Sequence, residues 1–95
     1  MLWHINGVHM DINETLDQRK KTHGIFTDHA QISQKLKAII SVQYNYGGLE
    51  DDQKEALEMI MHKVARILNG NPDIHDHWHD IAGYATLVAN RLKGD

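Results

Sequence analysis

The strongest constraint on the fold is a stripe of apolar residues that repeats with a helical period. Between positions 51 and 69, apolar side chains recur at spacings of three and four, at Leu57, Ile60, Met61, Val64 and Leu68. This period places them on one face of an α-helix, whereas a half-buried strand shows strict alternation. The acidic start at Asp51-Asp52 and the segment Asn69-Gly70-Asn71-Pro72 predict a helix over about 51–69.

Two further segments show the same period. Between about 28 and 43, the apolar positions are Ile32, Leu36, Ile39 and Ile40. Between about 75 and 93, they are Trp78, Ile81, Ala82, Ala85, Val88, Ala89 and Leu92. A short helix over about 14–22 precedes them and ends at Gly24, because glycine readily adopts the positive φ that stops a helix.

Three positions carry local expectations about these helices. Asn13 and Thr27 are predicted as N-caps, because their side chains accept hydrogen bonds from the first-turn N–H groups. Gly83 lies inside the last helix, where glycine costs on the order of 1 kcal/mol relative to alanine. We therefore expect Gly83 to serve close packing or access for a ligand.

The predicted fold class is all-α, an antiparallel bundle of three main helices preceded by the short one. The 95 residues make one domain, over 10–95, with 1–9 as a leader segment that is extended or disordered. Met10 is an alternative start, and Trp3 is expected to pack on the domain or on a neighbouring chain. Since a domain this small buries a modest core, we expect a homo-oligomer, a dimer or a tetramer.

Composition excludes several classes of function. There is no cysteine, which removes disulfides, thiolate zinc sites and cysteine nucleophiles. The net charge of −3 argues against binding to duplex nucleic acid or to anionic membranes. No apolar run approaches the roughly 18 residues of a membrane span. Residues 1–10 do not have the pattern of a signal peptide, so a cytoplasmic location is expected.

The polar faces of the last two helices suggest a binding site. Glu55, Glu58, His62 and Arg66 share one face of the helix at 51–69, with Lys63 at its border, and Asp73, His77, Asp80 and Tyr84 share one face of the next. If these faces meet, Glu55, Glu58, His77 and Asp80 would bind Mg²⁺ or Mn²⁺, which prefer oxygen ligands. The residues predicted to contact phosphate or base are His62, Lys63, Arg66 and Tyr84.

Three other interpretations remain open. The first is that both polar faces are simply exposed to solvent. Glu–His and His–Arg pairs one helical turn apart are common on solvated helix faces, where each contributes only tenths of a kcal/mol. Alternatively, Lys63 and Arg66 could neutralise Asp76 or Asp80 across the bundle, as an ion pair that fixes helix register. A rival zinc or nickel site consists of His75 and His79, one turn apart but without a third ligand in the sequence.

Two sets of motifs carry a family resemblance. Glu55-Ala-Leu-Glu58, followed after 18 residues by His77-Trp-His-Asp80, resembles the carboxylate pattern of the MazG-like all-α nucleoside triphosphate pyrophosphohydrolases. The pattern departs at Lys54 and at His77, where acidic residues are usual. His23-Gly24-Ile25-Phe26, Lys63-Val-Ala-Arg66-Ile67 and Asp80-Ile-Ala-Gly-Tyr84 resemble a family of small phage and prophage proteins of uncharacterised function. That family is similar to nucleotide-modification-associated domains.

These resemblances imply a MazG-like bundle and a phage-type protein that binds a nucleotide in the host cytoplasm. In MazG-like enzymes, facing helices supply carboxylates to Mg²⁺, and water attacks between the α- and β-phosphates. Whether this chain hydrolyses its ligand is left open, because His77 replaces an expected carboxylate. The alternative is a non-catalytic anti-defence protein, which binds a host defence protein complex or sequesters a nucleotide signal.

Overall fold

The computed structural model describes residues 4–5, 8–9 and 11–94. The helices are α1 (Ile12–His23), α2 (Phe26–Ser41), α3 (Asp51–Asn69) and α4 (His75–Lys93), with a 3₁₀ turn, η1, at Tyr46–Gly48. Two-residue strands, β1 (His4–Ile5) and β2 (Val8–His9), pair antiparallel in the described part of the leader. The predictions for Trp3 and Met10 concern positions outside the described residues.

The predicted all-α class is confirmed. The bounds of α3 and α4 agree with the predicted ranges, while α1 and α2 each begin two residues before the predicted start. Asn13 is not the cap of α1, since Asp11 Oδ1 accepts a hydrogen bond from the backbone N–H of Asn13 at 3.1 Å. Thr27 is not the cap of α2 either: the helix already begins at Phe26, after the extended residue Ile25, without a side-chain cap.

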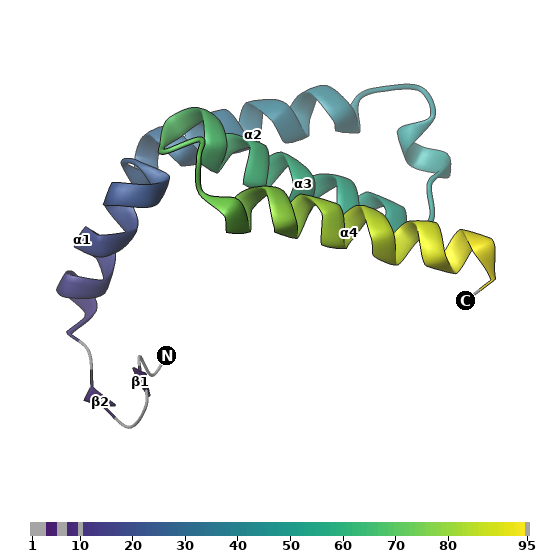
Figure 1. Cartoon of the computed structure of the whole chain (residues 1–95). Coiled ribbons are helices and arrows are strands. Elements are labelled where there is room, and N and C mark those ends of the chain that lie inside the picture. The colour runs from purple at the N-terminus through teal and green to yellow at the C-terminus, as the bar shows by residue number, and fades with distance from the viewer. Residues whose placement is uncertain (1–3, 6–7, 10, 95) are drawn as a thin grey trace.

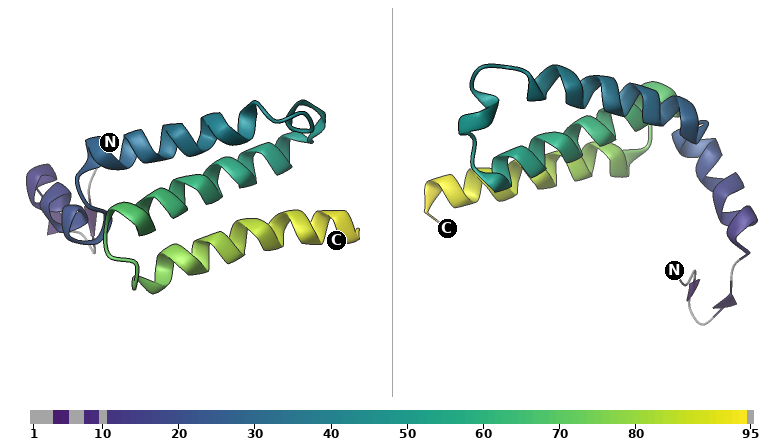
Figure 2. Two further views of the ribbon diagram at one scale, coloured as in Figure 1. Left: turned by 90° about the horizontal axis from the view of Figure 1, so that it is seen from above. Right: turned by 180° about the vertical axis from the view of Figure 1, so that it is seen from behind.

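The three long helices lie side by side in one layer, with α3 between α2 and α4 (Figure 1, Figure 2). Each runs antiparallel to its neighbour, as predicted, and the main contacts are those of α3 with α2 and with α4. Helix α1 extends away from one end of the layer (Figure 1). None of the helices among the described residues is sufficiently long and apolar to cross a bilayer.

Two ion pairs fix the register of α3 against α4. The Arg91 guanidinium donates two hydrogen bonds to the Asp52 carboxylate, at 2.7 and 2.6 Å. The Lys63 Nζ lies 2.8 Å from Asp80 Oδ2. The pairs are eleven residues apart on both helices, which is about three helical turns, so both lie along the same line of contact.

The helices meet without a large apolar core. Among the described residues, the buried hydrophobic ones are Ala56 and Ala65, and no large side chain is fully buried. Leu57 and Leu68, from the apolar stripe of α3, are 37% and 65% exposed, and Trp78 is 55% exposed. The stripes expected to meet inside the bundle therefore remain partly accessible in the single chain, where Ile60, Met61 and Val64 are half-buried.

A close backbone contact fixes the corner between α1 and α2 on the end of α3. The Asn69 Nδ2 donates hydrogen bonds to the carbonyls of His23 and Ile25, both at 2.9 Å. The backbone N–H of Asn71 donates to Thr22 O at 3.1 Å. Gly24 has φ 77°, and a Cβ there would collide with the Asn69 backbone, so this approach requires glycine.

Candidate functional site

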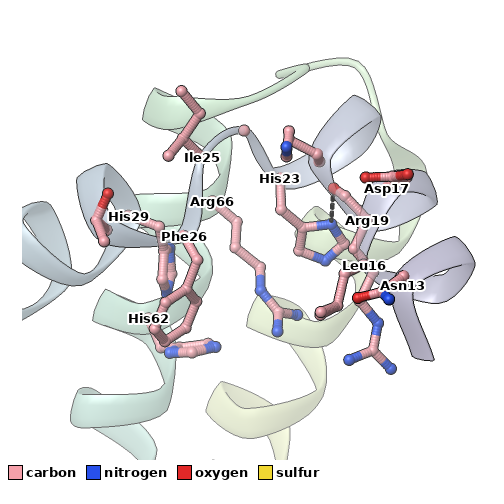
Figure 3. A pocket seen from close by; sticks show the side chains of 13 residues that line it. Asn13, Leu16, Asp17, Arg19, His23, Ile25, Phe26, His29, His62 and Arg66 are labelled. Carbon is pink, nitrogen blue, oxygen red and sulfur yellow. Dashed lines mark hydrogen bonds between the residues drawn. The ribbon is translucent and has the colours of Figure 1, made fainter.

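A cavity of about 570 Å³ lies between α1, the beginning of α2 and the C-terminal half of α3 (Figure 3). It is lined by side chains of three kinds. The cations are Arg19, Lys20 and Arg66; the imidazoles are His23, His29 and His62; and the large apolar residues are Leu16, Ile25 and Phe26. Asp17 is the one acidic residue among the lining residues that the structure describes. The cavity is therefore positive, although the whole chain carries a net charge of −3.

The corner between α1 and α2 positions these groups. His23 and Phe26 flank the turn that Asn69 holds, so this contact fixes the backbone from which both side chains extend. The His23 Nδ1 lies 3.1 Å from the carbonyl of Arg19, to which it donates as an N–H (Figure 3). In Figure 3, the Arg66 side chain extends between the group formed by His29 and His62 and the group formed by His23 and Leu16.

Two pairs of histidines pack edge to face around this corner. The ring centroids of His29 and His62 are 4.6 Å apart, and those of His23 and His77 are 5.0 Å apart. His29 and His77 are buried, with exposed fractions of 5% and 3%. The His29 Nδ1 and the His77 Nε2 are buried atoms that have no hydrogen-bond partner among the described residues. Such atoms are costly unless a partner reaches them.

Burial and Arg66 together keep the cavity imidazoles neutral near pH 7. Burial is the largest cause that lowers the pKa of His62, to about 4, and the positive charge of Arg66 is the second. The same two causes, in the same order, lower the pKa values of His23 and His29. Burial also lowers the pKa of Arg66, and the charge of Arg19 adds to this effect. Neutral imidazoles can donate or accept hydrogen bonds beside a fixed guanidinium charge.

The structure does not bring together the four predicted metal ligands. Glu58 accepts a hydrogen bond from the Tyr46 hydroxyl at 2.9 Å, and Asp80 pairs with Lys63. In the observed register, Glu55 and His77 lie on opposite sides of the Lys63–Asp80 pair, about 16 Å apart along the helices. Across the described part of the chain, no three His, Cys, Asp or Glu residues form a group that could hold a metal ion.

The residues predicted to contact phosphate or base divide into two sets. His62 and Arg66 line the cavity. Lys63 is buried and pairs with Asp80, so the alternative of an interhelical ion pair describes these two residues. Tyr84 lines shallow hollows along α4 instead.

The two histidines of the rival zinc or nickel site, His75 and His79, are both exposed. Their rings stack with centroids 5.4 Å apart.

Residues that sequence reasoning missed come mainly from the α1–α2 corner. Arg19, Lys20 and His29 were not predicted as site residues, and His23 and Phe26 appeared only in a family motif. Two signals pointed there: the basic end of α1 and the His23-Gly24-Ile25-Phe26 element directly after it. The cavity forms because the contact of Gly24 with Asn69 places the α1–α2 corner on the end of α3. The spacing of residues along the chain does not reveal a contact between such distant positions.

Comparison with known proteins gives a family rather than an activity. No curated protein and no solved structure matches the chain. A family model described as a domain of unknown function (DUF6378) matches residues 11–92, which hold nearly all of the four helices and every described residue that lines the cavity. The chain therefore belongs to the DUF6378 family.

Proposed function

We propose that this protein binds a nucleotide in the cavity between α1, α2 and α3. The observation that carries the proposal is the cluster of Arg19, Lys20 and Arg66 with one carboxylate among the described lining residues, in a chain that is acidic as a whole. The volume of about 570 Å³ falls within the range typical of small-molecule sites. A phosphorylated ligand satisfies both the charge and the size of this cavity.

The phosphate groups would bind at Arg66. This side chain is half-buried and forms no direct ion pair among the described residues, and the charge of Asp80, which Lys63 already binds, acts on it only from a greater distance. A guanidinium in such a position binds phosphate through two parallel hydrogen bonds, which are stronger than bonds between neutral groups. The neutral imidazoles of His23 and His62 add polar groups around it without requiring a second charge to be buried.

The base would lie against Phe26. This ring is 76% exposed, and its centroid is 6.1 Å from that of His29. Leu16 and Ile25, which also line the cavity, are 50% and 54% exposed. An exposed aromatic ring in a positive cavity suits a nucleobase, because stacking on such a ring contributes roughly 1–3 kcal/mol.

The proposal is binding without an assigned reaction. Glu55 and His77 lie about 16 Å apart along the helices, so the proposal assigns no hydrolytic step to the predicted Mg²⁺ ligands. The MazG-like resemblance supports the class of ligand, a nucleotide, and sequestration of a nucleotide signal requires no more than this cavity. No feature of the site favours the alternative function, in which this chain binds a host defence protein complex.

The test is isothermal titration with adenine and guanine mono-, di- and triphosphates, each with and without Mg²⁺, and with adenosine and inorganic phosphate as partial ligands. Arg66→Gln should weaken phosphate-dependent binding by about tenfold or more, since it removes a charge-assisted contact. Arg91→Gln makes the same chemical change at the far end of the layer and should leave affinity unchanged. Absence of binding to every compound, or equal effects of both substitutions, would refute the proposal.

A further inference from the structure

The middle helix turns the centre of its apolar stripe, at Leu57, Val64 and Leu68, away from both neighbours. Lys63 marks the side of α3 that contacts α4, and Glu58 marks the side that faces Tyr46, beyond the end of α2. At about 100° per residue, Leu57 lies about 120° from Lys63 and about 100° from Glu58 around the helix axis. Val64 and Leu68 lie within about 20° of Leu57. The stripe therefore faces outward from one side of the layer.

Helix α4 continues this face. Trp78, Ala85 and Leu92 recur every seven residues, and their line is on average about 130° around α4 from the Asp80 and Arg91 contacts with α3. On both helices, the rotation about the helix axis that leads from the ion-pair residues to the exposed apolar residues has the same direction. Two antiparallel neighbours are related by a two-fold axis perpendicular to the layer, and this axis keeps each face of the layer on its own side. Since the rotation from ion pair to apolar line has the same direction on α3 and α4, both apolar lines lie on the same face.

The exposed surface is larger than a chain of this size normally leaves open. The accessible surface is 7046 Å². A folded monomer of 10.9 kDa exposes about 5,600 Å². The excess is about 1,400 Å² per chain, and α1, which extends away from the layer, contributes to it together with the open face of the layer (Figure 1). An interface of standard size needs about 800 Å² from each partner, which is only part of this excess. The radius of gyration, 15.7 Å, exceeds the roughly 12 Å expected for a compact domain of this length, as a single layer with a projecting α1 would give.

We propose that a second copy of this chain packs on the apolar face of α3 and α4, so that two single layers become a two-layer, two-fold homodimer. Stable domains bury a core between two packed layers, and one chain supplies only one of them. A second copy brings an equal apolar area, which a two-fold axis places against the first. Arg66 lies on the opposite side of α3 from this face, so both cavities remain open in the dimer.

The test compares two leucines that are almost equally exposed in one chain. Leu68 lies on the proposed interface and is 65% exposed, whereas Leu87 is 67% exposed and lies about 180° around α4 from Trp78. Wild type and Leu87→Glu should sediment at twice the 10.9 kDa chain mass at micromolar concentration. Leu68→Glu should shift this species to the monomer or raise its dissociation constant by at least about tenfold, since a dimer would bury two added carboxylates.

Two further measurements keep the outcome decisive. Circular dichroism of each variant shows whether the helices are retained, and Ala85→Glu, at the centre of the α4 stripe, replaces Leu68→Glu if that variant unfolds. A monomeric wild type, or a dimer that Leu87→Glu weakens as much as the interface variants do, would overturn the proposal. A tetramer that Leu68→Glu converts to dimers would support this interface and add a second one. Titration with nucleotide in the same samples reports separately on the cavity.

Discussion

The corner between α1 and α2 should depend on one amide group, that of Asn69. Its Nδ2 donates to two carbonyls, those of His23 and Ile25, both at 2.9 Å. Asn69→Asp has the same shape but replaces the donor by an oxygen that faces both carbonyls. Each lost hydrogen bond costs about 1 kcal/mol net, so the free energy of unfolding should fall by about 2 kcal/mol before repulsion is added. For a domain of this size, that loss lowers the Tm by roughly 8–16 °C.

Asn71→Asp is the matched control, two residues away. The Asn71 Oδ1 accepts a hydrogen bond from the backbone N–H of Asp73 at 2.9 Å, and an aspartate there would still accept it. Urea unfolding followed by circular dichroism, at one protein concentration for all variants, measures both changes. A loss below about 0.5 kcal/mol for Asn69→Asp, or an equal loss for Asn71→Asp, would show that these bonds do not hold the corner.

Three further predictions concern charge and glycine. Asp80→Asn should lower the Tm, because it leaves the buried Lys63 without its charged partner. The hydrogen bond from Lys63 holds the pKa of Asp80 below 3.8. In the wild type, the pair should therefore add to the free energy of unfolding, measured in urea, above pH 3.8, and this contribution should be lost at lower pH; Asp80→Asn should not show this pH dependence. Burial lowers the pKa of His62 from 6.5 to about 4, so the folded state should lose stability as the pH falls through that range, and His62→Gln should flatten the profile. Gly83→Ala should raise the free energy of unfolding by up to about 1 kcal/mol, since its Cβ would meet open space, whereas Gly24→Ala should lower it by roughly 2 kcal/mol or more in the same thermal and urea assays.

The helices were largely predictable because their signals are local. Apolar spacing and the turn residues around Gly70 delimit α3 within the chain itself, and α4 follows in the same way. The start of α2 was not predictable, because the turn before Phe26 is held by Asn69, 44 residues from Ile25. Gly83 has no close neighbour in the single chain, so the packing reason expected for it does not arise within this layer.

The candidate site was less predictable, for two physical reasons. Helical phase shows which residues share a face, but it does not show how far one helix slides along its neighbour. The Lys63–Asp80 pair sets that position and separates Glu55 from His77. The cavity also depends on α1, whose placement follows from a backbone contact rather than from an apolar pattern. His62 and Arg66 were found because the polar face of α3 is itself a local signal.

The order of the helices in the layer has a consequence for folding. Helix α3 packs on α2 before it and on α4 after it, so the layer consists of two helical hairpins that share α3. Contacts between consecutive helices close short loops, which favours rapid folding of a single chain. Association of two layers is a separate step, whose rate depends on protein concentration. In a dilution series, the helical signal should therefore recover at a constant rate, while the slower shielding of Trp78 should accelerate with concentration.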